Sequence, residues 1–233
     1  AEADVTLSVN GETWLSFACT PTDLEALAVG FLFNEGVIQS AAEVMSVRVC
    51  AEGTHIDLWL SHSAAKPAQW RRTSGCTGGA TTAQGAPIPM LDPPHSTLIS
   101  PEQLLDNMDQ LFSNQALYHE VRGIHCAALS DGQTLRLIAE DIGRHNTLDK
   151  LAGMMSTQNI YPENRILLTT GRISSEMLQK SSRMGASMII SLTSPTSLSV
   201  QLAEENGITL IGYAKRNRFN IYTHPERINL DAP

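Results

Sequence analysis

Residues 1–70 carry short runs in which apolar and polar side chains alternate, the pattern of strands with one buried face. Asn10 and Gly11 stand between two such runs, and an Asn-Gly pair in that place is typical of a two-residue hairpin turn. Residues 23–36 repeat apolar side chains at helical spacing, which predicts a helix. We therefore expect a small α+β domain here. Its strands and helix are expected at residues 4–9, 12–20, 23–36, 44–50 and 55–60.

A loop-like texture, rich in Gly, Pro, Ala, Thr and Ser, begins near Ser61 and ends near Ser100. Connections of this length without secondary structure are uncommon inside compact domains, and those that occur often carry function. We expect a Gly/Pro-rich loop over residues 71–99 that separates two domains and bears Cys76. We also expect this loop to move, because the glycines around Cys76 lower the barriers to backbone rearrangement.

The pattern over residues 100–233 is more regular. Ser100 followed by Pro101 predicts the start of a helix, and Asp131-Gly132 between strand-like runs predicts a second hairpin. Three short apolar strands then alternate with two helical patterns. Such a βαβαβ unit implies parallel strands inside a mixed sheet covered by helices, so we expect an α/β domain. The three strands are expected at residues 165–170, 187–194 and 208–214.

The composition is that of a folded, acidic protein. Of the 233 residues, 42% are apolar and 17% are charged, which allows a sizeable core and argues against disorder. Lys and Arg number 16 against 24 Asp and Glu, and the net charge of −8 argues against a general nucleic-acid or membrane binder. No apolar run approaches the roughly 18 to 20 residues of a membrane span, and the start lacks a signal-peptide layout. We expect a cytoplasmic protein with no nucleic-acid or membrane partner.

Chemistry is expected where the strands of the βαβαβ unit end. Parallel strands end at one edge of their sheet, so the loops that follow them share a crevice. Two of these loops open helices, whose free N–H groups attract anions, and the third adds cationic side chains. We therefore expect a site for a phosphate-bearing ligand. The alternative is that Ser174 and Ser194 are ordinary N-caps and that the basic run is a solvated loop. The loops are Gly171-Arg172-Ile173-Ser174, Thr193-Ser194-Pro195-Thr196 and Lys215-Arg216-Asn217-Arg218.

Cys76 is the candidate nucleophile. It lies in a glycine-rich run near Arg71 and Arg72, and neighbouring positive charge favours the reactive thiolate form. An incidental surface cysteine is the alternative. The other cysteines lie in apolar strand-like runs, where we expect small buried side chains and neither a disulfide framework nor a metal site. They are Cys19, Cys50 and Cys126.

The run EDIGRHN, at residues 140–146, packs polar side chains into an expected strand-to-helix loop. We assign Asp141 and His145 to shaping the ligand pocket, because Asp141 begins the loop and His145 lies just before the helix. Asn146 or Thr147 is expected to cap that helix. The alternative for His145 is a hydrogen-bonded structural role.

Taken together, these motifs resemble the FdhD family, the formate dehydrogenase accessory sulfurtransferases. The resemblance covers nearly the whole chain and rests on long, specific runs. They are DLEALAVGFLFNEGVI at 23–38, GCTGG at 75–79, GIHCAAL at 123–129, EDIGRHNTLDK at 140–150, GRISSEMLQKS at 171–181 and the block from SPTSLSV to HPERI at 194–228.

The resemblance implies a protein that takes sulfur from a cysteine desulfurase and passes it to the molybdenum bis-molybdopterin guanine dinucleotide cofactor of formate dehydrogenase. It implies a homodimer, with GDP as an analogue of the cofactor. It also implies a three-layer C-terminal domain that resembles the cytidine deaminase fold without its zinc residues. It puts the sulfur-carrying cysteine at Cys76 and the cofactor-binding run on Tyr213, Ala214, Lys215, Arg216, Asn217 and Arg218.

One residue departs from the family pattern. The family shows Cys-x-x-Cys in its loop, but the second position here is Gly79. A single thiolate can still accept sulfur from a persulfide, so we expect a sulfurtransferase that uses Cys76 alone. The alternative, which Gly79 favours, is a non-catalytic chaperone with the same pocket. A hydrolytic nucleotide deaminase is disfavoured, because His224-Pro225-Glu226 is not followed by the Pro-Cys-x-x-Cys of that class.

Overall fold

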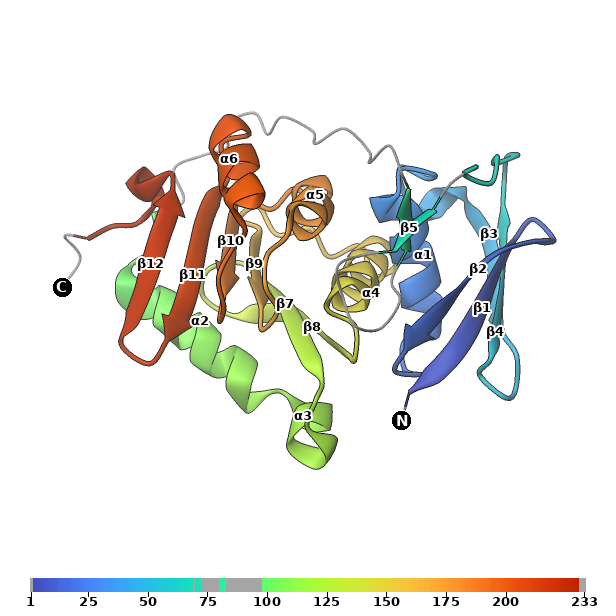
Figure 1. The fold of residues 1–233 in the computed structure, drawn as a ribbon, viewed down its shortest axis with the longest axis horizontal. Coiled ribbons are helices and arrows are strands. Elements are labelled where there is room, and N and C mark those ends of the chain that lie inside the picture. Colours follow the sequence, from blue (N-terminus) through green and yellow to red (C-terminus); the bar gives the residue numbers. More distant parts are fainter. Residues whose placement is uncertain (1, 69, 73–79, 83–97, 231–233) are drawn as a thin grey trace.

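The computed structural model describes residues 2–68, 70–72, 80–82 and 98–230. In this part of the chain, a four-stranded sheet and a six-stranded sheet lie on opposite sides of a layer of helices (Figure 1). One further long helix covers the outer face of the six-stranded sheet. The molecule is therefore a stack of sheet and helix layers.

The N-terminal unit is a four-stranded sheet in the order β2-β1-β4-β3, with one helix on its inner face. The Asn10-Gly11 turn joins the first two strands as predicted, with φ angles of 51° and 82° that suit a tight hairpin turn. Leu7, Ile56 and Leu27 share one core between sheet and helix. The elements are β1 (Ala3–Val9), β2 (Glu12–Cys19), α1 (Leu24–Asn34), a short 3₁₀ turn (Ala41–Glu43), β3 (Val44–Val49) and β4 (His55–Leu60).

The segment expected to be one loop over residues 71–99 contains parts of two short strands, so that expectation is wrong for five of its residues. β5 (Trp70–Arg72) and β6 (Ala80–Thr82) pair antiparallel, with Arg72 opposite Ala80. Aromatic and β-branched residues in these runs favour extended backbone, which the Gly/Pro-rich texture around them obscured. Cys76 lies between the two strands in sequence, outside the described residues. The prediction that its loop moves also concerns residues outside the described part of the chain.

The C-terminal unit is built on a six-stranded sheet in the order β12-β11-β10-β9-β7-β8. β9, β10 and β11 run parallel, as predicted, and β7 and β12 pair antiparallel at either side of them. The strands are β7 (His125–Ser130), β8 (Leu135–Asp141), β9 (Ile166–Thr169), β10 (Met188–Ser191), β11 (Thr209–Lys215) and β12 (Arg218–Thr223). The helices are α2 (Pro101–Ser113), α3 (Ala116–Val121), α4 (Arg144–Thr157), α5 (Ser175–Arg183) and α6 (Ser197–Glu205), with a 3₁₀ turn at Pro225–Arg227.

Both faces of the six-stranded sheet are covered, which makes the unit a three-layer α/β arrangement. Along β9, Ile166 and Leu168 face the core shared with α2, whereas Leu167 faces the core shared with α4, α5 and α6. This alternation is the period of two that a strand requires. A strand buried on both faces reads as a continuous apolar run, which is why the short apolar runs identified these strands correctly.

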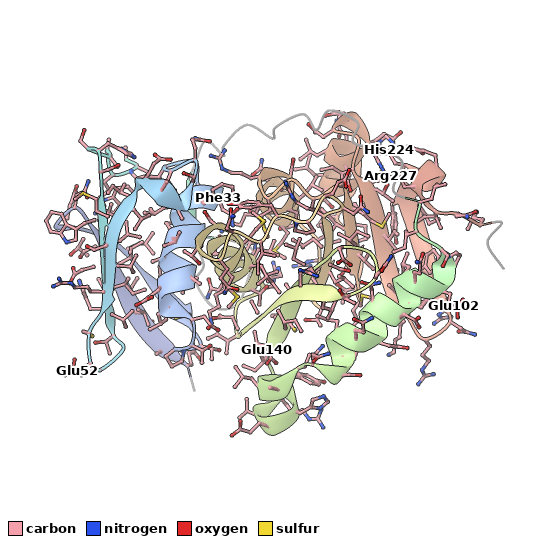
Figure 2. The ribbon with its side chains drawn as sticks, turned by 180° about the vertical axis from the view of Figure 1, so that it is seen from behind. Phe33, Glu52, Glu102, Glu140, His224 and Arg227 are labelled. Atoms are coloured by element: carbon pink, nitrogen blue, oxygen red, sulfur yellow. The ribbon has the colours of Figure 1, made fainter. Side chains whose placement is uncertain are left out.

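The two units meet where α1 crosses α4 at very close range. A β-carbon at Gly30 of α1 would lie 1.7 Å from the carbonyl oxygen of Asp149, and one at Gly153 of α4 would lie 1.9 Å from that of Ala26. Only glycine fits at these two points. Phe33, at the end of α1, packs against the cores of both units (Figure 2).

Helix α4 begins earlier than the sequence pattern predicts. Gly143 is its N-cap and Arg144 its first residue, so the expected loop over 141–146 ends two residues after Asp141. His145 lies inside the helix, and the prediction that Asn146 or Thr147 caps it is wrong. The polar side chains of this first turn are buried against other elements, and this tertiary burial holds residues that look like a loop in a helix.

Candidate functional site

The structure brings the three predicted loops to one edge of the six-stranded sheet. The loop after β9 contacts the loop after β10, since Thr196 N donates to the Ile173 carbonyl at 2.9 Å and Ile173 N donates to the Ser194 carbonyl at 3.4 Å. The loop after β10 contacts β11, since Tyr213 N donates to the Thr193 carbonyl at 3.1 Å. These contacts confirm that the first two loops meet, whereas the third loop follows β11 beyond them.

Gly171 fixes the first loop against helix α4. A β-carbon at this position would lie 2.8 Å from Cβ of Arg144, so any larger residue would push the loop off the helix. The carbonyl of Gly171 accepts a hydrogen bond from Ser191 Oγ at 2.8 Å, which ties the loop to the end of β10. Arg172 follows and points to solvent. The loop thus presents one cation on a rigid support.

The N-termini of α5 and α6 differ in what they offer an anion. Ser174 caps α5, accepting from Met177 N at 3.4 Å, and it also donates to the Glu176 carboxylate at 2.8 Å. The protein's own carboxylate therefore occupies the positive end of α5. Thr196 caps α6 through Ser199 N at 3.2 Å, so the alternative that made Ser194 an N-cap is wrong. The first turn of α6 carries no acidic side chain, so α6 is the end better suited to an anion.

The basic run forms a tight turn that extends beyond the edge. β10 ends at Ser191, one residue after Ile190, which pairs with Ile211 of β11. β11 continues to Lys215, which at about 3.3 Å per residue is about 10 Å past the end of β10. Lys215 pairs with Arg218 across the turn, and all four turn residues are exposed. They line a hollow of ≈ 330 Å³. The turn therefore holds its cationic side chains in solvent, beyond the end of β10.

Tyr213 and Ala214, the first two residues of the predicted binding run, face opposite ways. Tyr213 has a φ of 55° and sits at an irregularity in the pairing of β11 with β12, and its side chain is 48% exposed. Ala214 is completely buried in the core shared with α2. Of these two residues, only Tyr213 has an exposed side chain.

Asp141 faces the protein interior. One carboxylate oxygen accepts from Gly143 N at 2.8 Å and from Asn146 Nδ2 at 2.9 Å, and the other accepts from Thr20 N at 3.0 Å. The buried ammonium of Lys150 lies 2.8 Å away. Asp141 therefore positions the loop before α4 and ties it to the N-terminal unit.

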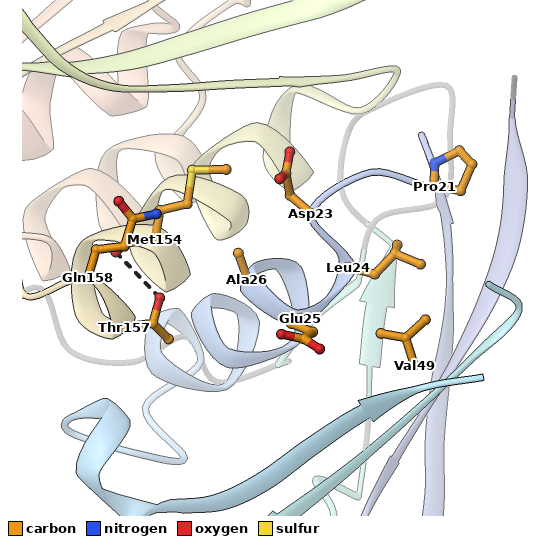
Figure 3. A pocket seen from close by; sticks show the side chains of 9 residues that line it. All are labelled: Pro21, Asp23, Leu24, Glu25, Ala26, Val49, Met154, Thr157 and Gln158. Atoms are coloured by element: carbon orange, nitrogen blue, oxygen red, sulfur yellow. Dashed lines mark hydrogen bonds between the residues drawn. The ribbon is translucent and has the colours of Figure 1, made fainter. Parts of the chain in front are cut away.

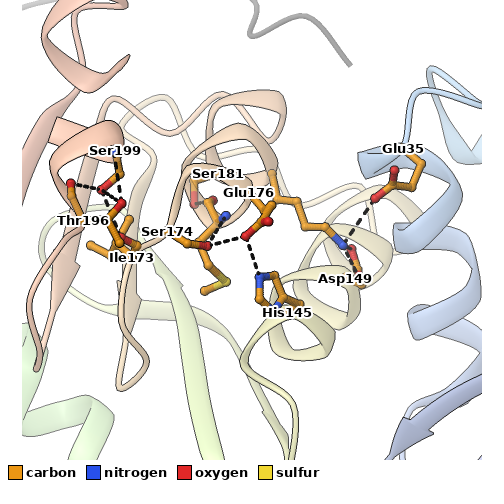
Figure 4. A network of polar contacts seen from close by, with 11 residues as sticks. Glu35, His145, Asp149, Ile173, Ser174, Glu176, Ser181, Thr196 and Ser199 are labelled. Atoms are coloured by element: carbon orange, nitrogen blue, oxygen red, sulfur yellow. Dashed lines mark hydrogen bonds and ion pairs between the residues drawn. The ribbon is translucent and has the colours of Figure 1, made fainter. Parts of the chain in front are cut away.

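His145 is buried beneath the N-terminus of α5 (Figure 4). Its Nε2 lies 3.6 Å from Oε2 of Glu176. Burial lowers the pKa of His145 to about 4, and the neighbouring histidine and Ser174 hydroxyl hold the pKa of Glu176 at about 2. At neutral pH the pair is a neutral imidazole beside a carboxylate. The pair packs at the start of α5, and Glu176 stays charged at the N-terminus of that helix.

A second buried cluster lies one helical turn farther along the same face of α4 and joins the two units (Figure 4). Lys180 Nζ lies 2.7 and 2.6 Å from the two carboxylate oxygens of Asp149 and 3.7 Å from Glu35 Oε1. Asn34 donates to Asp149 at 2.8 Å. Burial nevertheless raises the pKa of Asp149. The cluster links α1, α4 and α5 and is structural.

His125 also stands at this edge, although it was not among the predicted site residues. It begins β7, between β8 and β9, and its Nδ1 lies 3.4 Å from Thr170 Oγ1. Burial and the charge of Arg144 lower its pKa. Because β7 runs antiparallel to β9, its start meets the strand ends, and this register could not be read from the run itself.

The described cysteines differ in exposure. Cys19 and Cys126 are buried as predicted, and burial raises the pKa of both thiols, that of Cys19 to about 12. The expectation for Cys50 is wrong: it is partly exposed after β3, and hydrogen bonds from Thr54 lower its pKa. The strand expected over residues 44–50 ends at Val49, so Cys50 lies just outside it. Cys50 is therefore the competitor against which any role of Cys76 must be tested.

A larger hollow of ≈ 510 Å³ lies between the start of α1 and the end of α4 (Figure 3). Met154 and Thr157 line it from α4, and Asp23 and Glu25 bring negative charge to it. No predicted site residue lines this hollow. Its acidic lining does not suit a phosphate-bearing ligand.

Comparison with known proteins decides the family. A sequence profile described as the FdhD/NarQ family matches residues 1–229. The chain belongs to this family. The protein named sulfur carrier protein FdhD in Staphylococcus aureus strain MRSA252 is 37% identical over 233 residues, a match that covers 97% of this chain and 88% of the relative. The protein of the same name in strain Newman matches to the same extent.

A solved structure agrees with the family assignment. The crystal structure of a protein described as a formate dehydrogenase accessory protein, from Desulfotalea psychrophila, superposes with a TM-score of 0.80 at 26% sequence identity. The match covers 98% of this chain and 90% of that one. The resemblance drawn from the motifs is thus confirmed at the level of the family.

No group of three or more His, Cys, Asp or Glu side chains in residues 2–68 and 98–230 is arranged to hold a metal ion. Within the same part of the chain, no helix has the length and apolar character needed to cross a membrane.

Proposed function

We propose that this protein accepts sulfur on Cys76 and delivers it to the molybdenum bis-molybdopterin guanine dinucleotide cofactor, for use by formate dehydrogenase. Relatives named sulfur carrier protein FdhD match almost the whole chain, which supports the sulfur-transfer part of the proposal. The cofactor is the substrate, and the sheet edge is its binding site.

The observation that carries the cofactor part is the concentration of positive charge at one edge of an acidic protein. The net charge is −8, yet Lys215, Arg216 and Arg218 extend into solvent past the end of β10, and Arg172 is exposed on the loop after β9. Guanine dinucleotide phosphates are anionic, and such a local basic group attracts them where the remaining surface repels them. GDP should bind there as an analogue.

The loading step is a thiol–persulfide exchange. The Cys76 thiolate attacks the outer sulfur of the persulfide on a cysteine desulfurase, a new S–S bond forms, and the desulfurase cysteine leaves as a thiolate. No electrons are gained or lost in this step. Release of the carried sulfur as hydrosulfide requires a thiol that attacks the inner sulfur and leaves Cys76 in a mixed disulfide. Gly79 cannot supply that thiol, so it comes from outside the loop.

We place this activity in the cytoplasm, on a homodimer that meets both a cysteine desulfurase and formate dehydrogenase. The likeness to a described formate dehydrogenase accessory protein supports the second partner. We further propose that the C-terminal three-layer unit is a cytidine deaminase-like fold whose zinc site has been lost. The mixed six-stranded sheet, covered by helices on both faces, supports this proposal.

A non-catalytic cofactor chaperone is the second candidate, favoured by Gly79 in place of a second loop cysteine. The two candidates differ in whether Cys76 is needed after the cofactor has bound. Formate dehydrogenase activity should be measured in cells that depend on this protein, with the unaltered chain, Cys76→Ser and Cys50→Ser. The carrier predicts loss of activity in Cys76→Ser alone. Full activity of Cys76→Ser together with retained GDP binding would instead support the chaperone.

A further inference from the structure

One face of the edge strand β12 carries a row of exposed side chains. Phe219 and Ile221 pack into the core shared with α2, and strand geometry turns the alternating residues to the opposite face, toward α6. Those alternating residues are Arg218, Asn220 and Tyr222, and all three are exposed. The row therefore runs from a cation at the basic turn, through an amide, to an aromatic ring.

The ring of Tyr222 has a prepared support. A β-carbon at Gly212 of β11 would lie 3.0 Å from Cε2 of Tyr222 and 3.0 Å from Cδ of Pro195. The absence of a side chain at Gly212 thus leaves the space in which ring and proline pack. Tyr222 nevertheless remains 37% exposed. One part of the ring is held by the protein, and another part is open to a ligand.

The charges of the site share this face. Lys215 pairs directly with Arg218, so both side chains project on the same side of the hairpin as Tyr222. Asn220 lies opposite Gly212, between the turn and the ring. The loop that carries Pro195 ends in the N-terminus of α6, which has no acidic side chain in its first turn. A flat ring on Tyr222 and a diphosphate at the turn can therefore belong to one ligand.

We propose that Tyr222 is the ring-stacking residue of the ligand site and receives the flat base of a guanine nucleotide whose phosphates reach Lys215 and Arg218. This inference rests on the proposed function and extends the binding surface past the basic turn to residues 220 and 222. A partly supported aromatic ring offers its face to a base at low entropic cost, because little is left to order on binding.

Calorimetric titration with GDP and with inorganic pyrophosphate separates the ring from the phosphates. Base–aromatic stacking is worth roughly tenfold to a hundredfold in affinity. Tyr222→Ala should therefore raise the Kd for GDP by that factor and leave the Kd for pyrophosphate unchanged, whereas Tyr222→Phe should bind both as the unaltered protein does. Tyr161→Ala is the matched control, because Tyr161 is 42% exposed outside the predicted site, in contact with Arg165.

The outcomes distinguish this inference from the proposed function. If the unaltered protein binds GDP and Tyr222→Ala binds it equally well, the inference is wrong and the proposed function stands. An equal loss of GDP and pyrophosphate in Tyr222→Ala, or a change of oligomeric state with GDP affinity retained, also overturns it, since the residue then supports the turn or a protein interface. Absence of GDP binding to the unaltered protein overturns both.

Discussion

The carboxylate of Asp141 lies 2.8 Å from the ammonium of Lys150, and both side chains are completely buried. Lys150 also donates to the Thr20 and Glu140 carbonyls, each at 3.1 Å, and Asp141 accepts from Thr20 N. One ion pair therefore ties the loop before α4, the end of β8 and the N-terminal unit together. Its hydrogen bonds satisfy both charges, which a buried pair requires.

Removal of one partner of this pair should destabilise the fold strongly. Lys150→Met leaves the Asp141 carboxylate buried without its counter-charge, and we expect a loss of about 3 to 5 kcal/mol in the free energy of unfolding, measured by urea titration. The double variant Asp141→Asn, Lys150→Met should recover part of that loss. A single variant as stable as the unaltered protein contradicts this role.

The His145–Glu176 contact predicts a pH dependence of stability. Burial holds the pKa of His145 at about 4 in the folded protein, below the ordinary value of 6.5. The unfolded chain therefore binds the proton more readily, and the stabilisation present above pH 6.5 is lost as the pH falls toward 4. We expect this histidine to account for a fall of about 3 kcal/mol in the free energy of unfolding over that range.

The matched measurement compares two histidine variants by urea unfolding at several pH values. His145→Gln removes the titrating group, so its stability should fall less between pH 6.5 and 4 than that of the unaltered protein. His62→Gln removes an exposed histidine and should keep the steeper fall. Identical slopes in His145→Gln and the unaltered protein would show that His145 is not the buried titrating group.

The close crossing of α1 and α4 should not tolerate a methyl group. Gly30→Ala places its β-carbon 1.7 Å from a backbone oxygen of α4, and relief requires the helices to separate. We expect a loss of about 3 kcal/mol or more in the free energy of unfolding. Glu25→Ala, on the exposed side of α1, should change it by less than about 0.5 kcal/mol. A Gly30→Ala protein of unaltered stability would refute the crossing.

The predictable part of the fold followed from local signals. A few adjacent residues were enough to predict the Asn10-Gly11 turn, the Ser100 cap and the strands β9 and β10. β12 was missed because its basic first residues looked like a continued loop, although Phe219 and Ile221 alternate as a strand does. The signal was present but short.

The candidate site was predictable in outline and not in its details. Parallel strands oblige the three loops to meet, so the edge could be foreseen. The roles of individual residues depend on contacts across long sequence separations. Asp141 accepts a hydrogen bond from Thr20, and His145 contacts Glu176. Two polar side chains that suggested ligand contact therefore make their contacts inside the protein. No local pattern encodes such pairings.

Binding of an anionic ligand at the basic turn should depend on charge. The double variant Lys215→Ala, Arg218→Ala should weaken GDP binding in calorimetry, each lost charge-assisted contact costing about 1.5 to 3 kcal/mol. Added salt should weaken the unaltered protein's binding more than that of the variant. Arg136→Ala, an exposed arginine on β8, serves as control and should bind normally. Unchanged affinity in the double variant would move the site elsewhere.

The most direct test of the account is intact-protein mass spectrometry after incubation with a cysteine desulfurase and cysteine. We predict the addition of sulfur to the unaltered protein and to Cys50→Ser, and none to Cys76→Ser. Cys50 is the decisive control, because it is partly exposed and hydrogen bonds from Thr54 lower the pKa of its thiol. Sulfur mapped to Cys50, or equal labelling of Cys76→Ser and the unaltered protein, would contradict a carrier role for Cys76.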